Sequence, residues 1–261
     1  MTSAQIKLID TGKALIEVML TGEAGPLIVL LPSAGRAALD FDFLAGELSN
    51  AGWRTAAINP RGAGNSAGSL DDITLHTYAE DVSNVIKALD GIPAIVLGHA
   101  WGNRVARCFA ADHTELVRCL VLLAAGGKVP MAPEVMEAMG KLRKGLSADE
   151  ARSALKIAFF AKDSDPTAWM TGFWPESVKA NQKANQATPI EEWWSGGEAP
   201  ILVIQGKEDR CALPENAYLL KEEYGDRITV IDIDNAAHAL LPEQPEVIAE
   251  QVINYLNDYL S

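Results

Sequence analysis

The chain has 261 residues, of which 48% are hydrophobic and 22% charged, a composition that supports a large buried core and predicts one globular domain with room for an inserted lobe. Its 35 acidic side chains outnumber the 22 basic ones, and the formal net charge of −13 repels nucleic-acid phosphates and anionic lipid headgroups. We therefore expect neither nucleic acid nor a membrane as a partner.

The N-terminus and the cysteines favour a soluble, cytoplasmic protein. No basic run leads into an apolar core with a cleavage site, and the longest apolar runs fall far short of the roughly 20 residues that span a bilayer. Cys108, Cys119 and Cys211 are too few and too scattered for a disulfide framework, and no CxxC pair offers a metal site. We expect no metal; a secreted protein with one disulfide is the alternative.

Short apolar runs alternate with longer segments of helical period, which is typical of a mostly parallel sheet covered by helices. In chain order, strands are predicted at residues 6–10, 14–20, 27–31, 54–58, 94–97, 117–123, 201–205 and 228–233. Helices are predicted at 41–51, around 78–89, immediately after 102, at 214–224 and at 245–259. The pattern predicts an α/β fold with a twisted sheet of the eight-stranded type, flanked by helices.

One region breaks this alternation. Residues 128–198 contain no strand candidate and are rich in Met, Trp, Phe and Ala at helical spacing. We interpret them as a helical cap inserted into a core made of residues 1–127 and 199–261. Its large apolar side chains either line an apolar pocket or form the lobe's own core, and at least half must do the latter: Phe159, Phe160, Trp169, Met170, Trp174, Trp193 and Trp194. Trp169 and Trp174 are the candidates for substrate contact.

The stretch GHAWG, residues 98–102, joins a predicted strand to a predicted helix. It has the form of a nucleophile elbow, glycine-x-nucleophile-x-glycine, with Ala100 at the nucleophile position. In such a turn the central residue is held in a strained conformation, so its neighbours two positions away must lack Cβ atoms. Residue 100 should therefore project at the carboxyl end of the sheet, where open α/β sheets bind ligands.

A nucleophile at an elbow needs a base and a carboxylate that orients the base. Asp209 follows the strand at 201–205, and His238 lies in a loop after the last strand, which gives the order nucleophile, acid, histidine. Glu208 competes with Asp209 for the acid role. His238 could instead only cap the last helix, which would leave the placement of Asp209 unexplained.

The other three histidines have ordinary explanations. His99 precedes the elbow and is expected to be packed and hydrogen-bonded beneath it, whereas His76 and His113 lie in polar contexts and are expected to be exposed. Asp81 is interpreted as a structural residue.

Five motifs together resemble the α/β-hydrolase family along essentially the whole chain. They are LIVLLPSAG, INPRGAGNS, GHAWG, GKEDRCALP and AAHALLPEQPE, in that order. The resemblance implies a serine hydrolase mechanism in which position 100, Asp209 and His238 form the triad and no cofactor is needed.

The oxyanion loop departs from the family pattern, because Pro32 and Ser33 stand where relatives have His-Gly. We expect the backbone N–H groups of Ala34 and Trp101 to form the oxyanion hole, with the Ser33 hydroxyl as an additional contact. Arg36 and Arg104 could hold a substrate carboxylate, although each is more often part of a structural ion pair. Cys211 could be imagined as a substitute nucleophile, but we interpret it as a small buried thiol.

Three explanations of Ala100 remain. The chain is a serine hydrolase whose serine was replaced by alanine, a naturally non-catalytic ligand-binding or receptor-like relative, or an enzyme that uses the histidine as a base without a nucleophile. We favour deliberate replacement, because strain of about 1–3 kcal/mol is kept at a position that glycine would relax, and because Asp209 and His238 are both present.

The expected substrate is a small molecule, an ester or lactone with an apolar body; amide and carbon–carbon bond hydrolysis stay open. Haloalkane dehalogenases and epoxide hydrolases need a carboxylate at the elbow, and epoxide opening would want lobe tyrosines, which are absent between residues 128 and 198. The sequence leaves the oligomeric state open, with a homodimer among the alternatives.

Overall fold

The computed structural model describes residues 4–142 and 145–260, and a single mixed sheet runs through it. In spatial order the sheet contains β1 (Gln5–Asp10), β2 (Ala14–Thr21), β4 (Arg54–Ile58), β3 (Leu27–Leu31), β6 (Ala94–His99), β7 (Val117–Leu123), β8 (Ile201–Gly206) and β9 (Ile228–Ile233). β2 pairs antiparallel with β1, with β4 and with the two-residue β5 (Ala67–Gly68), and the strands from β4 to β9 are parallel. The α/β fold predicted from the sequence is confirmed.

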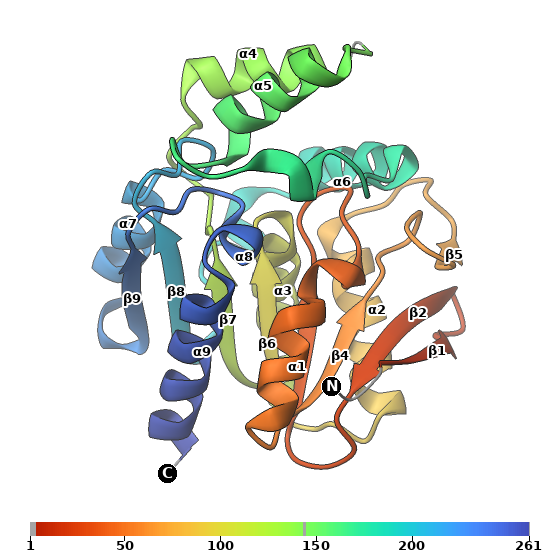
Figure 1. Ribbon diagram of the computed structural model, residues 1–261. Helices are drawn as coiled ribbons and strands as arrows, with labels where there is room; N and C mark the ends of the chain where they lie inside the picture. The colour runs from red at the N-terminus through yellow and green to blue at the C-terminus, as the bar shows by residue number, and fades with distance from the viewer. Residues whose placement is uncertain (1–3, 143–144, 261) are drawn as a thin grey trace.

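Helices cover both faces of this sheet (Figure 1). α1 (Asp42–Asn50), α8 (Leu240–Glu243) and α9 (Pro245–Leu260) pack on one face, and α2 (Leu75–Ala88), α3 (Trp101–Asp112) and α7 (Glu215–Tyr224) pack on the other. Three short 3-10 turns lie in this core: Ala38–Phe41 precedes α1, Thr114–Leu116 precedes β7, and Gly225–Arg227 precedes β9. This layering explains why the parallel strands read as continuous apolar runs, since both of their faces are buried.

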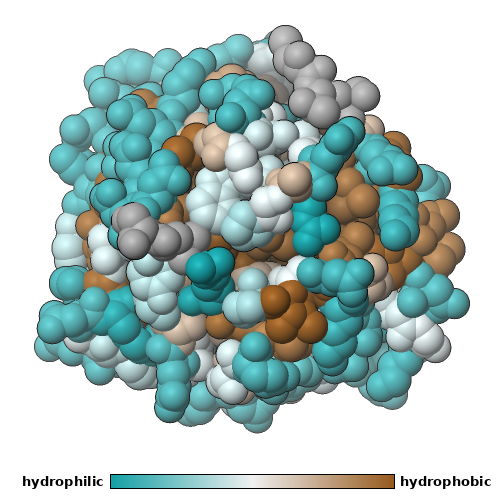
Figure 2. Space-filling view, turned by 90° about the horizontal axis from the view of Figure 1, so that it is seen from below, coloured by the Kyte–Doolittle hydropathy of each residue, from teal (hydrophilic) through white to brown (hydrophobic). Residues whose placement is uncertain are grey.

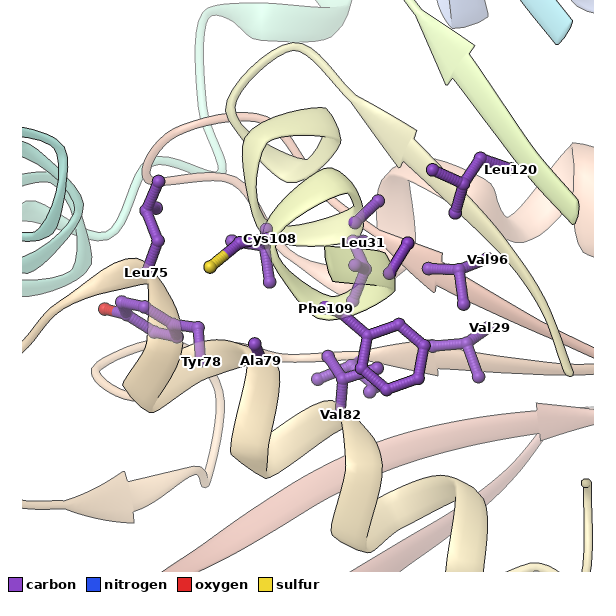
Figure 3. Packing of buried hydrophobic residues seen from close by; sticks show 14 of the residues in the cluster. Val29, Leu31, Leu75, Tyr78, Ala79, Val82, Val96, Cys108, Phe109 and Leu120 are labelled. Carbon is purple, nitrogen blue, oxygen red and sulfur yellow. The ribbon is translucent and has the colours of Figure 1, made fainter. Parts of the chain in front are cut away.

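The packing between α2, α3 and the sheet is close. Figure 3 shows Phe109 of α3 between Val82 of α2 and Val29 of β3, and Cys108 directed from α3 toward Leu75 and Tyr78 of α2. Burying a large apolar side chain of this kind contributes roughly 1.5–3 kcal/mol. These contacts fix the position of α3, whose N-terminus follows residue 100 directly.

The segment between β7 and β8 contains no strand within the residues that the structure describes. It forms α4 (Pro133–Leu142), α5 (Ala148–Phe159), α6 (Pro175–Ala187) and the short turns η3 (Pro166–Trp169) and η4 (Ile190–Glu192). α4, α5 and α6 lie above the carboxyl ends of the parallel strands (Figure 1). α4 and α5 share a small apolar core of Val135, Ala138, Ala154 and Ala158. That this segment acts as a cap stays a prediction.

Two details differ from the sequence-based elements. β6 extends two residues beyond the expected end, because Gly98 and His99 continue the ladder against Leu122 and Leu123 of β7. β5 was not expected, since two residues of Ala-Gly carry no alternating pattern. The first of these brings the strand to the very edge of the elbow.

The surface seen from the side where the parallel strands begin is mostly hydrophilic, with hydrophobic residues gathered toward one side of the view (Figure 2). Among the described residues, no helix combines the length and the apolar character that crossing a membrane requires.

We predict that Gly102→Ala destabilises the fold strongly, because a Cβ at that position would lie 2.1 Å from the backbone oxygen of Leu31. A forced backbone shift of this kind is expected to lower the free energy of unfolding by about 1–3 kcal/mol or more. Gly46→Ala in α1 is the matched control, since a Cβ there meets nothing within 4 Å. This substitution is expected to raise the free energy of unfolding by at most about 1 kcal/mol. Urea denaturation measures both; equal effects of the two substitutions would contradict the packing argument.

Candidate active site

Ala100 occupies the backbone conformation expected of an elbow residue. Its φ is 51° and its ψ is −108°, a region that costs a non-glycine residue about 1–3 kcal/mol. The Ala100 N–H donates to the Leu123 carbonyl at 2.9 Å, and the Ala100 carbonyl accepts from the Asn103 N–H at 3.1 Å. Hydrogen bonds on both sides therefore hold the strained residue in place at the carboxyl end of β6.

The two glycines of the elbow are required by close backbone contact. A Cβ at Gly98 would lie 2.4 Å from the Gly102 oxygen, and one at Gly102 would lie 2.1 Å from the Leu31 oxygen and 2.8 Å from the Pro32 oxygen. The first turn of α3 thus rests on the end of β3. This contact brings Trp101, the residue after Ala100, next to the loop that follows β3.

Asp209 and His238 meet across the carboxyl ends of β8 and β9. The His238 Nδ1 and Asp209 Oδ2 are 2.9 Å apart, and the residues are 6% and 1% exposed. The other Asp209 oxygen accepts the N–H groups of Cys211 and Ala212, both at 2.8 Å. Glu208 instead accepts the Lys162 N–H at an exposed position. The geometry therefore pairs the histidine with Asp209 and not with Glu208.

His99 connects this pair to the elbow. Its Nε2–H donates to the His238 carbonyl at 2.7 Å, and the two rings lie 5.9 Å apart. The expectation that His99 is packed and hydrogen-bonded is confirmed, since it is 1% exposed. Because His99 immediately precedes Ala100, one residue and one hydrogen bond separate the nucleophile position from His238.

The pKa values of the two buried histidines, His238 and His99, are shifted in opposite directions. Burial acts to lower the pKa of His238, but the neighbouring Cys211 and Asp209 side chains outweigh it and raise that pKa well above its ordinary value. Burial, together with the charge of His238, lowers the pKa of His99 to about 3. His99 is therefore a neutral hydrogen-bond donor, and His238 is the basic one.

Aromatic side chains of the inserted segment lie directly against His238. The Phe159 ring stacks on the imidazole at 5.7 Å with an interplanar angle of 30°, and the Phe159 carbonyl accepts the Ala239 N–H at 2.9 Å. Trp169 is 3% exposed and lies 5.3 Å from Phe159 and 6.0 Å from His99. Trp169 is thus brought to the site, and Phe159 proves to be the closer of the two.

Glu243 lies next to the candidate site and was not among the residues predicted from the sequence. Its two carboxylate oxygens accept the Ala237 N–H at 2.8 Å and the Ala161 N–H at 2.7 Å, and burial raises its pKa. The carboxylate ties the His238 loop to the segment after α5. Its only signal is an acidic residue in a helical turn just after a histidine, which is too common to be distinctive.

Cys211 lies closer to the chemistry than expected. Its side chain is within hydrogen-bonding reach of the His238 imidazole, is only partly buried and packs against the apolar core of α4 and α5. The interpretation of Cys211 as a small buried thiol is therefore wrong, since the residue is only partly buried and its side chain faces His238.

The candidate oxyanion donors are available. Within the described residues, neither the Ala34 nor the Trp101 backbone N–H donates to another protein group. Ser33 is 6% exposed, and its carbonyl accepts the Arg36 N–H at 3.0 Å. Two unpaired N–H groups at a closely packed turn are suited to stabilise a negatively charged oxygen.

Arg36 and Trp174 are not brought to the site as binding groups. The Arg36 guanidinium pairs with Asp40 at 2.6 and 2.8 Å, donates to the Thr171 carbonyl at 2.6 Å and lies over the Trp169 ring. The Trp174 side chain is exposed. The backbone N–H of Trp174 donates to the Gly35 carbonyl at 2.8 Å. Their substrate-binding roles stay predictions that these contacts do not favour.

Two tryptophans near the end of the inserted segment belong to the core. Trp193 and Trp194 are 3% and 2% exposed, and both rings lie over the buried Arg107 guanidinium, at 4.6 and 4.9 Å. The Arg104 guanidinium also lies over the Trp193 ring, at 5.2 Å, and makes no ion pair within the described part of the chain. The buried Arg107 Nη1 has no hydrogen-bond partner within the described residues either.

Residues 28–251 match the family model described as "Alpha/beta hydrolase family". The chain belongs to the α/β-hydrolase family. Among curated members it is similar to protein phosphatase methylesterase 1 of Mus musculus, with 33% identity over 37% of this chain and 26% of that protein. Epoxide hydrolase 3 of Xenopus tropicalis is 30% identical over 46% of this chain and 33% of that protein. The matched region is thus a third or less of these relatives' lengths.

Solved structures of the family share the fold over nearly the whole chain. The structure of E-2-(acetamidomethylene)succinate hydrolase has a TM-score of 0.79 at 19% identity and covers 97% of this chain and 99% of that one. Naproxen esterase from Bacillus subtilis has a TM-score of 0.77 at 20% identity, covering 98% and 92%. At such identities the likeness establishes the fold alone.

We predict that His238 in the chain as given titrates above the ordinary histidine pKa of about 6.5, while His99 stays neutral above pH 5. A raised folded pKa means that the Asp209–His238 interaction stabilises the fold fully below the unfolded pKa and is lost as pH rises through the folded one. Asp209→Asn should lower the His238 pKa. NMR titration of the imidazole protons measures this; an unchanged His238 pKa in the variant would contradict the pairing.

Proposed function

We propose that the chain is the scaffold of a serine hydrolase that acts on an ester or lactone with an apolar body, with Ala100 standing at the position of the nucleophilic serine. The buried Asp209–His238 pair, joined through His99 to the elbow, is the observation that carries this proposal. A binding protein has no chemical need for a histidine held by a carboxylate whose other oxygen is itself held by two N–H groups.

With a serine at position 100, these residues have the contacts that an acyl transfer requires. Asp209 holds His238 through Nδ1, which leaves Nε2 to take the serine proton as the serine oxygen bonds to the substrate carbonyl carbon. The N–H groups of Ala34 and Trp101 stabilise the oxyanion. The proton on His238 then passes to the departing alcohol. Water, deprotonated by His238, attacks the acyl-enzyme carbonyl carbon, and His238 returns that proton to the serine oxygen as the bond to serine breaks and the acid leaves.

In the chain as given, the missing oxygen removes the covalent step and leaves the binding surfaces in place. Loss of a triad serine can reduce turnover by about a million-fold while ground-state binding persists. Such a form holds its substrate without consuming it. The strained Ala100 conformation supports replacement of a serine, because a site with no use for a side chain could relax with glycine.

The contacts around His238 support an apolar substrate. The Phe159 ring lies against the His238 imidazole, and the Trp169 ring lies next to Phe159 and His99. Arg104, one helical turn after Ala100 and without an ion pair in the described residues, is the group left to hold a substrate carboxylate. Amide and carbon–carbon bond hydrolysis stay alternatives with the same residues.

We predict that Ala100→Ser hydrolyses p-nitrophenyl acetate and reacts with a fluorophosphonate probe, whereas the chain as given does neither. Ala100→Gly is the matched control at the same position: it should remain inert and gain about 1 kcal/mol of stability from released strain. Adding His238→Asn to Ala100→Ser should abolish turnover, while adding Cys211→Ser should leave it. Chromogenic assays and mass spectrometry of the labelled chain measure these outcomes.

Other outcomes separate the alternatives. A folded but inert Ala100→Ser variant that binds a small ligand tightly would favour the ligand-binding relative. Activity of Ala100→Asp on an epoxide, with none of Ala100→Ser on esters, would favour the epoxide hydrolase class. Turnover by Ala100→Ser that disappears with Cys211→Ser would assign the chemistry to the thiol instead.

A further inference from the structure

A second group of reactive side chains lies on the outside of the α2–α3 pair, separate from the elbow. It consists of His76 near the start of α2, Cys108 and Asp112 one turn apart on α3, and Glu192 at the end of η4. The Cys108 thiol lies on the α3 face directed toward Leu75, the neighbour of His76 (Figure 3). Within the described residues, only here do three potential ligand atoms of His, Cys, Asp or Glu all lie within 4.8 Å of one another.

Two of the three distances between the converging atoms are close to those between the ligands of one metal ion. The His76 Nδ1 is 2.7 Å from the Asp112 Oδ2 and 3.4 Å from the Cys108 Sγ, and that sulfur is 3.7 Å from the same carboxylate oxygen. A tetrahedral zinc ion with ordinary bond lengths separates its N, O and S ligands by about 3.3–3.6 Å. Both distances to the sulfur are close to this range, and for an ion to enter, the His76 Nδ1–Asp112 Oδ2 separation must widen by about 0.6–0.9 Å and give up its hydrogen bond.

Glu192 supplies the outer contact that such sites use. Its carboxylate lies 2.7 Å from the His76 Nε2, on the far side of the ring from Cys108 and Asp112. A carboxylate on one imidazole nitrogen fixes the proton there and directs the lone pair of the other nitrogen toward a metal. The His76, Asp112 and Glu192 side chains are 39%, 29% and 47% exposed, so an ion can approach these three from solvent. Cys108 is buried, and the ion would meet its thiol from the side of His76 and Asp112.

We propose that His76, Cys108 and Asp112 bind a divalent transition-metal ion of the zinc type, with Glu192 orienting the histidine and water at the fourth position. Binding transfers the Cys108 thiol proton, and any proton on the His76 Nδ1, to solvent. The ion fastens α2 to α3 and, through Glu192, to the end of the inserted segment. It lies outside the hydrolytic machinery and does not depend on the proposed function.

The test is Co²⁺ titration of the chelator-treated, reduced chain. We expect one ion per chain, a thiolate-to-cobalt absorption band, displacement by Zn²⁺ and a higher melting temperature with metal. Cys108→Ser should remove the band. Cys119→Ser and Cys211→Ser are matched controls that should keep it, because all three cysteines are free and the other two lie outside this group.

Two further variants keep the test decisive if Cys108→Ser does not fold. Asp112→Asn, at a part-exposed position, should weaken binding at least tenfold, and Glu192→Gln should weaken it about 10- to 100-fold. Absence of stoichiometric binding would overturn the proposal and leave the group as a hydrogen-bonded network. A cobalt band that survives both Cys108→Ser and Asp112→Asn would overturn it equally, since the ion would then bind elsewhere.

Discussion

The strained turn at Ala100 is the constraint on which the rest of the site depends. A positive φ at an alanine persists because hydrogen bonds to Leu123 and Asn103 hold it and because the flanking glycines let α3 rest on the end of β3. The same contact sets the Trp101 N–H beside the loop after β3. A Cβ at either glycine would push α3 away from the strands it rests on. The position of the candidate oxyanion donors therefore depends on the same close contacts as the elbow.

His238, the base in the proposed mechanism, is held by contacts from the sheet side and from the inserted segment. From below, His99 donates to the His238 carbonyl, and its depressed pKa keeps it a neutral donor. From above, Phe159 stacks on the imidazole and Glu243 links the histidine loop to the chain after α5. The backbone of the inserted segment therefore holds the loop that carries His238. This coupling makes the position of α5 a determinant of the base's orientation.

The parts of the site that follow from local backbone demands could be predicted from the sequence. The elbow glycines, Asp209 at the end of a strand and His238 in the next loop each belong to short motifs whose spacing reflects a turn. Phe159, Glu243 and the Cys211 side chain could not be predicted, because their roles depend on how a helical segment of unspecified position packs on the sheet.

Arg36 is a residue for which the sequence suggested a role that its contacts do not favour. Its place near the oxyanion loop suggested ligand binding, but Asp40 and the Thr171 carbonyl occupy its donors. The group around His76 could not be predicted for a related reason. Its residues come from two helices and a distant turn, so no short sequence motif contains them. Only the packing of α2 on α3 makes Cys108 and His76 neighbours.

The central claim is that the vacated elbow position, His238 and the Ala34 and Trp101 amides form one reaction centre. The most direct measurement is a crystal structure of the Ala100→Ser variant after reaction with a fluorophosphonate. Our account predicts an adduct on the introduced serine with a phosphoryl oxygen about 2.7–3.1 Å from both backbone nitrogens and the His238 Nε2 facing the serine oxygen. An adduct whose oxygen points away from both amides, or whose serine oxygen lies out of reach of His238, would contradict it.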